Sequence, residues 1–81
     1  MKIPRNITGR ELVVKLETLG YEKTRQTGSQ IRLTRSTHNK TYHVTVPAHN
    51  PLRVGTFNSI LKDVANHFNI SKEKLIEKME F

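Results

Sequence analysis

Three stretches of the chain carry apolar residues at the three- and four-residue spacing of an amphipathic helix. In residues 8–19 the apolar positions are Leu12, Val13, Leu16 and Leu19. In residues 57–68 they are Phe57, Ile60, Leu61, Val64, Ala65 and Phe68. A shorter stretch near the end has Leu75, Ile76 and Met79. The pattern predicts two main helices, each with one buried face, and a short third helix.

Residue types at the ends of these stretches predict where each helix begins and ends. Thr8 is placed to accept a hydrogen bond from the backbone N–H three residues on, as the first member of a capping box. Gly20 is suited to the left-handed conformation that ends a helix. We expect Thr56 to cap the second helix, Asn69 to end it, and Ser71 to open the third.

Between the first two helices the pattern changes to the alternation of β-strands. Residues 30–35 and 41–47 alternate clearly, with Ile31, Leu33, Tyr42, Val44 and Val46 on one side. Residues 21–26 are a weaker strand for which Tyr21 is the expected core residue. Gly28 is predicted in a tight turn after this strand, and Pro47 ends the last strand because it cannot donate to a ladder.

The order of these elements predicts an α+β fold in one domain over residues 1–81. Three strands joined by short turns form an antiparallel meander, and both main helices should cover its apolar face. The result is a two-layer sandwich, α-β-β-β-α with a short extra C-terminal helix. The opposite face of the sheet then presents polar and basic side chains to solvent, namely Gln30, Arg32, Thr34, His43 and Thr45.

The charge of the chain is strongly positive and unevenly distributed. Fourteen Lys and Arg against seven Asp and Glu give a net charge of +7, and residues 1–55 hold all of the excess. Between Lys23 and Arg53 there is no acidic residue. One-sided charge in a small domain indicates a polyanion-binding protein, most simply one that binds RNA. The alternative is that the charge serves solubility alone.

Composition also bears on the cellular location. The chain has no cysteine, which fits a reducing cytosol and leaves no thiolate for a metal site or disulfide. No apolar run approaches the roughly 20 residues needed to cross a bilayer. Residues 1–5 lack the apolar stretch of a signal peptide, and the helices carry mixed charge, unlike membrane-surface helices. We therefore expect a cytoplasmic protein without membrane contact.

Three segments in order resemble the HicA family of toxin ribonucleases. They are residues 25–33 (RQTGSQIRL), 45–52 (TVPAHNPL) and 55–61 (GTFNSIL). With the first helix, the likeness covers most of residues 8–65. The resemblance implies a fold similar to double-stranded RNA-binding domains. It also implies cleavage of messenger RNA without a metal or other cofactor, and neutralisation by a partner antitoxin, HicB.

At one position the chain departs from this family. The family has Gly-Ser-His after the first strand, with the histidine regarded as catalytic, and this chain has Gly28, Ser29 and Gln30. An amide cannot accept or deliver a proton near neutral pH, as metal-free RNA cleavage requires. Gln30 therefore predicts a site that binds RNA but cleaves it poorly. The alternatives are a non-catalytic RNA-binding module of the same fold and a domain that binds only a protein partner.

Other residues of the site are predicted from their places on the sheet. His43, on the same face as Gln30, is the alternative acid–base group; otherwise it is an exposed histidine in contact with phosphate or water. His67, near the end of the second helix, is explained by a favourable contact with the helix dipole. No histidine pair has a chelate spacing, so no metal site is expected. The predicted RNA-binding residues are Arg25, Gly28, Ser29, Arg32, Arg35 and Lys40.

Overall fold

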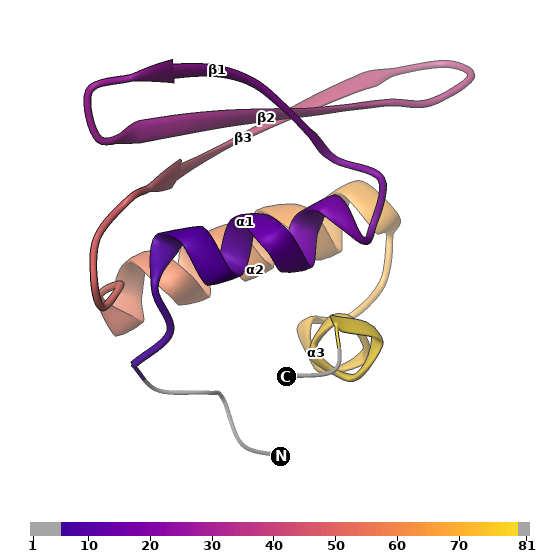
Figure 1. Ribbon diagram of the computed structural model, residues 1–81. Helices are drawn as coiled ribbons and strands as arrows, with labels where there is room; N and C mark the ends of the chain where they lie inside the picture. Colours follow the sequence, from indigo (N-terminus) through magenta and orange to yellow (C-terminus); the bar gives the residue numbers. More distant parts are fainter. Residues whose placement is uncertain (1–5, 80–81) are drawn as a thin grey trace.

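The computed structural model describes residues 6–79. Residues 1–5, on which the expectation about a signal peptide rests, and residues 80–81 lie outside the described part. Figure 1 shows the six elements in chain order. They are α1 (Gly9–Glu17), β1 (Glu22–Thr27), β2 (Gln30–Ser36), β3 (Thr41–Pro47), α2 (Val54–Phe68) and α3 (Lys72–Met79).

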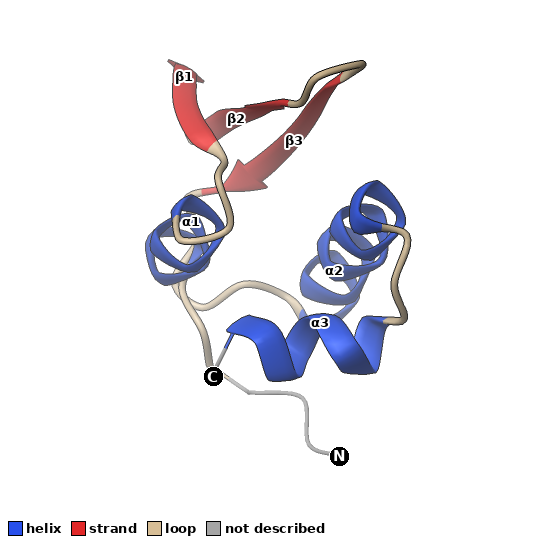
Figure 2. Ribbon diagram, turned by 90° about the vertical axis from the view of Figure 1, so that its right-hand side faces the viewer, coloured by secondary structure: helices blue, strands red, loops and turns tan. Residues whose placement is uncertain are grey.

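The strands form one antiparallel sheet in the order β1-β2-β3, as predicted. Figures 1 and 2 show α1 and α2 side by side on the same side of this sheet, with α3 beneath them, away from the strands. The predicted α+β sandwich is therefore confirmed, and its arrangement is consistent with the fold of double-stranded RNA-binding domains. No helix of the described residues covers the other face of the sheet.

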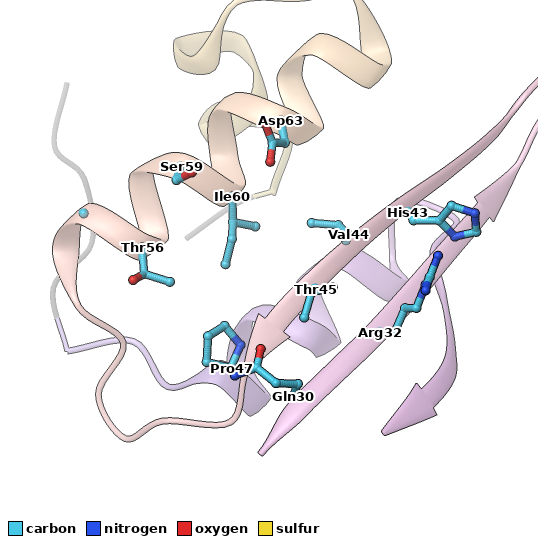
Figure 3. Close-up of a pocket in the computed structure, with 11 residues that line it drawn as sticks. Gln30, Arg32, His43, Val44, Thr45, Pro47, Thr56, Ser59, Ile60 and Asp63 are labelled. Atoms are coloured by element: carbon cyan, nitrogen blue, oxygen red, sulfur yellow. The ribbon is translucent and has the colours of Figure 1, made fainter. Parts of the chain in front are cut away.

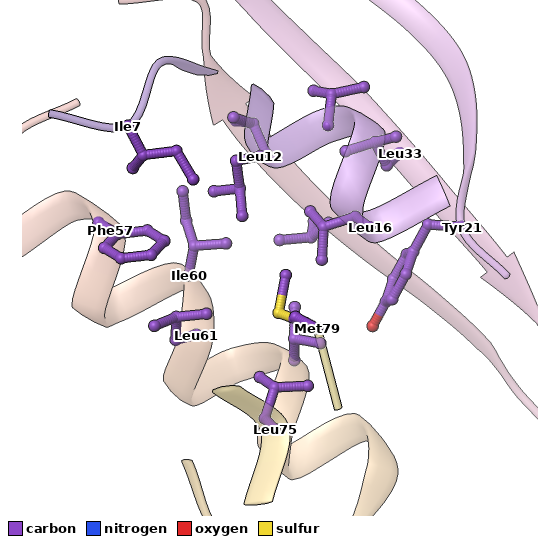
Figure 4. Close-up of a cluster of buried hydrophobic side chains, with 14 of the residues drawn as sticks. Ile7, Leu12, Leu16, Tyr21, Leu33, Phe57, Ile60, Leu61, Leu75 and Met79 are labelled. Atoms are coloured by element: carbon purple, nitrogen blue, oxygen red, sulfur yellow. The ribbon is translucent and has the colours of Figure 1, made fainter. Parts of the chain in front are cut away.

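Alternation along β2 and β3 decides which face the helices cover. Ile31, Leu33, Val44 and Val46 are buried against the helices, while all six residues of β1 are exposed. The weak first strand is tied to the core by Tyr21, which directly precedes it and is 1% exposed. Figure 4 shows the apolar cluster that α1, α2, α3 and the sheet enclose.

Three of the predicted helix boundaries are confirmed. The Thr8 hydroxyl accepts a hydrogen bond from the Glu11 N–H at 3.0 Å. Asn69 adopts the left-handed conformation after α2, with φ 56° and ψ 44°. The Ser71 hydroxyl accepts from the Lys74 N–H at 3.1 Å and opens α3. The hydroxyls of Thr8 and Ser71 satisfy backbone N–H groups that a helix start leaves unpaired. Asn69 acts through its backbone N–H, which donates to the Ala65 and Asn66 carbonyls at the end of α2.

The predicted start of α2 is wrong. The helix begins at Val54, and its N-cap is Arg53, which makes no side-chain capping bond. The chain is fixed immediately before it, because Leu52 is buried and its N–H donates to the Ile7 carbonyl at 2.8 Å. This anchor starts the helix two residues before Thr56, although Val54 and Gly55 are poor helix formers.

The segment between β3 and α2 is held against the start of α1 and the β1–β2 turn. The Gly9 N–H donates to the His49 carbonyl at 2.9 Å, and the Ala48 N–H donates to the Ser29 carbonyl at 2.6 Å. Gly9 packs directly on the Pro47 carbonyl, and a Cβ there would overlap that oxygen. These contacts fix the position of the turn that precedes Gln30.

Candidate nucleic-acid interface

The face of the sheet away from the helices is polar. In the register of the sheet, Thr34 lies opposite His43 and Arg32 lies opposite Thr45. Gln30 follows on the same face, at the first position of β2. Of these residues only Thr34 is partly covered; the others are exposed. The five side chains predicted to face solvent therefore do so.

This polar face opens into a groove of about 710 Å³ between β3 and α2 (Figure 3). Its sheet wall is formed mainly by Gln30, Arg32, His43 and Thr45. Its helix wall includes Thr56, Ser59 and Asp63. β3 is an edge strand, so nothing of the sheet closes the groove on this side. The groove combines cationic and hydrogen-bonding groups on one wall with hydroxyls and a carboxylate on the other.

Two arginines lie together beside Gln30. Arg25 and Arg32 are register partners on β1 and β2, and with Gln30 they line a second hollow of about 170 Å³. Within residues 6–79 neither guanidinium pairs with a carboxylate. Like charges directly opposite each other destabilise a sheet. A phosphate between them would relieve this repulsion and accept hydrogen bonds from both.

The turn before Gln30 has the predicted conformation. Gly28 has φ 57°, and no atom lies within 4 Å of where its Cβ would be. Its carbonyl accepts from the Gln26 side-chain amide at 3.2 Å. Ser29 is exposed and is held through its carbonyl, as described above. The turn is thus fixed on one side and open to solvent on the other.

Arg35 and Lys40 lie away from this group. Arg35 is on the helix-covered face, paired with Tyr42, and its guanidinium lies 4.2 Å from the centre of the Phe68 ring. Lys40 is in the hairpin between β2 and β3, at the far end of β2 from Gln30. The length of β2 separates Lys40 from Gln30 by about 20 Å. Of the four predicted cations, only Arg25 and Arg32 surround Gln30.

A chain of hydrogen bonds runs across the polar face to His43. His43 Nδ1 lies 3.1 Å from the Thr34 hydroxyl, and that hydroxyl lies 3.0 Å from the Thr24 hydroxyl. Thr24 donates in turn to the Arg32 carbonyl at 3.4 Å. The register of β1 shifts between Lys23 and Arg25. Such a bulge reorients the side chain of its extra residue, here Thr24.

His67 lies near the end of α2, away from the groove, and its contacts differ from the predicted contact with the helix dipole. Its Nδ1 is 2.7 Å from the Tyr21 hydroxyl, and its ring stacks on Tyr42 with centroids 4.5 Å apart. Burial raises the pKa of Tyr21 to about 12, so its hydroxyl stays protonated. It donates to or accepts from the imidazole according to which ring nitrogen carries the proton. Burial lowers the pKa of His67, although Asp63 raises it. A dipole contact would favour the charged ring; this site favours the neutral one.

The remaining histidines lie outside the groove. His38 is in the exposed hairpin after β2, and the exposed His49 contributes its backbone carbonyl to Gly9. In the described part of the chain, no three His, Asp or Glu residues gather as a possible metal site. Among the same residues, no helix is long and apolar enough to cross a membrane.

Comparison with known proteins identifies the family. A family model described as the HicA toxin of bacterial toxin–antitoxin systems matches residues 9–65, more than half of the chain. The chain belongs to the HicA toxin family. No curated protein and no solved structure matches it. The HicA match runs from α1 into α2 and so includes both walls of the groove, while α3 lies beyond it.

Sequence reasoning missed the helix wall of the groove and the threonine chain. Thr56, Ser59 and Asp63 recur at helical spacing beside the apolar stripe of α2. That polar stripe was a signal that the helix presents a second, hydrophilic face near the sheet. Thr24 offered no such signal, because its contact with Thr34 depends on the bulge in β1. Membership of the HicA toxin family implies an antitoxin partner.

Proposed function

We propose that this HicA-family chain binds messenger RNA across the exposed face of its sheet and is a ribonuclease impaired at position 30. The observation that carries the proposal is the position of Gln30 beside Arg25 and Arg32, which pair with no carboxylate within residues 6–79. Phosphate contacts from arginine hold the backbone of an RNA without reading its sequence. Gln30 is then next to the bound backbone, at the position where the family has histidine.

The impairment follows from the chemistry of the side chain. Cleavage without a metal needs a group that takes the proton of the 2′-hydroxyl or protonates the leaving oxygen. Histidine does so near neutral pH, whereas the glutamine amide only donates and accepts hydrogen bonds. Loss of a positioned acid–base group slows a reaction by about 10²- to 10⁴-fold. RNA binding depends on the arginines and is expected to remain.

We further propose that the partner is a HicB-type antitoxin and that the pair acts in the cytoplasm, where messenger RNA is translated. An antitoxin that covers the groove would block access to Gln30 and its arginines. Because this wall is cationic, acidic groups on the antitoxin would complement it.

The test is the substitution Gln30→His. We expect it to raise the rate of cleavage of a single-stranded RNA by about 10²-fold or more and to arrest growth when expressed in bacteria. Coexpression of the antitoxin should restore growth. RNA affinity, measured by fluorescence anisotropy, should change by less than about tenfold because the phosphate contacts are unaltered.

Asn39→His is the matched control. Asn39 also carries an exposed amide, but it lies in the hairpin between β2 and β3, at the far end of β2 from Gln30. An imidazole there should leave cleavage unchanged. If Gln30→His binds RNA and does not cut it, the chain is a non-catalytic RNA-binding module. If neither form binds RNA, the proposed function is wrong.

A further inference from the structure

The hydrogen-bond chain on the polar face indicates which ring nitrogen carries the proton when His43 is neutral. A hydroxyl has one hydrogen, and Thr24 gives its hydrogen to the Arg32 carbonyl. Thr24 must therefore accept from Thr34 across the 3.0 Å contact between them. Thr34 then has no hydrogen left for the imidazole and accepts from it. The neutral ring carries its proton on Nδ1, and Nε2 has a free lone pair.

A histidine held in this way is prepared for proton transfer. In catalytic triads a partner that accepts from Nδ1 sets the tautomer and leaves Nε2 to act as the base. His43 is exposed and lines the groove with Arg32. Figure 3 shows the two side chains next to each other on the same side of the strands. A phosphate bound by Arg32 would thus lie beside the imidazole.

We propose that His43 is a second acid–base residue for RNA cleavage in this chain, held by Thr34 and acting at a phosphate bound by Arg32. The inference rests on the proposed function, since it requires RNA on this face. His43 is not a replacement for Gln30 at the same point. Along β2, Gln30 and Thr34, the register partner of His43, are four positions apart, a distance of about 13 Å. His43 therefore serves a neighbouring phosphate of the bound strand.

The reaction balances without a metal or other co-reactant. His43 Nε2 takes the proton of a 2′-hydroxyl, and the 2′-oxygen forms a bond to the adjacent phosphorus. The bond from that phosphorus to the 5′-oxygen of the next nucleotide breaks. The imidazolium returns its proton to this leaving oxygen. The products are a 2′,3′-cyclic phosphate and a 5′-hydroxyl, and the histidine is regenerated.

Charged groups lie on the elements to either side of His43. Arg32 and Asp63 line the same groove, from β2 and α2. On the far side of Thr34, Glu22 is its register partner on β1. Rates are therefore compared between variants over the range in which imidazoles titrate, about pH 5 to 8. A rate that follows one ionisation should lose this dependence when His43 is replaced.

The first experiment measures single-turnover cleavage of a short RNA by the chain as written and by His43→Gln. We expect cleavage above that of RNA alone, and a loss of about 10²-fold or more in His43→Gln, with RNA affinity unchanged within about tenfold. A DNA strand of the same sequence, which has no 2′-hydroxyl groups, should not be cut. The matched control is His38→Gln, which changes the exposed hairpin histidine and should leave the rate unchanged.

The second experiment follows the tautomer itself. In ¹⁵N NMR spectra, Nδ1 of neutral His43 should be the protonated nitrogen, and Thr34→Val should remove this preference and lower the cleavage rate. Equal rates for His43→Gln and the chain as written would overturn the inference, as would a proton found on Nε2 or cleavage no faster than that of RNA alone. A faster cleavage by Gln30→His in the same assays would support the proposed function even when the inference about His43 is overturned.

Discussion

Gly9 and Gly55 both lie in first turns of helices, yet their surroundings differ. Gly9 is buried at the start of α1, where the Pro47 carbonyl and the Ala48 Cα approach it too closely for a side chain. Gly55 is in the first turn of α2, with open space where its Cβ would be. Gly9 is therefore required by packing, whereas Gly55 only costs the helix some stability.

This contrast predicts opposite effects of one substitution. Gly9→Ala should destabilise the protein by about 1–3 kcal/mol, because the chain after β3 must move away from α1. Gly55→Ala should stabilise it by up to about 1 kcal/mol, because alanine restricts the unfolded chain and favours the helix. Urea denaturation of both variants measures the two changes. Effects of the same sign would mean that the contact at Pro47 is not tight.

At the scale of elements, the end of α2 is held to the sheet by aromatic and polar contacts. His67 joins Tyr21 before β1 to Tyr42 on β3, and the next residue, Phe68, receives the Arg35 guanidinium. The groove lies further toward the other end of the same helix, next to Gly55 and Ser59. One helix therefore has a structural end and an end that faces the proposed RNA site.

The neutral form of His67 makes stability depend on pH. Its pKa is lowered in the folded protein, chiefly by burial, with Arg35 adding to the effect and Asp63 opposing it. The unfolded chain, with an ordinary histidine pKa of about 6.5, then binds the proton more readily. This contribution to stability is complete above about pH 6.5 and is lost as the pH falls toward the folded-state pKa.

We therefore expect the free energy of unfolding to fall between pH 7 and pH 5, and His67→Gln to reduce this fall. His38→Gln, in the exposed hairpin, should leave the pH dependence as it is. Thermal or urea unfolding at a series of pH values gives the comparison. If His67→Gln keeps the full slope, another group is responsible for it.

Prediction of the elements from sequence succeeded where a local signal and the packing agreed. Thr8 and Asn69 have side chains or backbone preferences that suit the helix ends where they are found. Thr56 had an equally good signal, but the anchor at Leu52 started α2 earlier. That anchor depends on Ile7, which is distant in the chain, so no local pattern could reveal it. The sequence also predicts Arg35 as a phosphate contact. The local pattern does not reveal its contact with the Phe68 ring, because that ring comes from another element.

At the scale of the whole molecule, the main feature is the placement of the positively charged side chains. The net charge of +7 comes from residues 1–55, but three arginines of the described part lie on two different faces of the sheet. Arg25 and Arg32 lie on the polar face, while Arg35 lies against Phe68 on the other side of the sheet. The placement of these three arginines on two faces follows from the pleat of β2 and from the position of α2.

Salt dependence of RNA binding tests this placement. Binding of single-stranded RNA should weaken with salt at a slope of about −0.7 per neutralised phosphate in a plot of log affinity against log salt. Replacing Arg25 and Arg32 by alanine should flatten the slope by about 1.4. The matched control replaces Lys62 and Lys74, which are exposed on α2 and α3. Equal flattening by both pairs would show that charge acts without regard to face.

The exposure of Gln30 has a further consequence for how the toxin can evolve. Its side chain lies on the solvent face of the first residue of β2, outside the apolar core. Exchange with histidine therefore alters no packing and little of the free energy of folding. Glutamine and histidine codons differ only in their third base. Under the proposed function, one point mutation at position 30 would then remove or restore toxicity. It would not require an unfolded protein as an intermediate, and it would leave unchanged most of the surface that an antitoxin would bind.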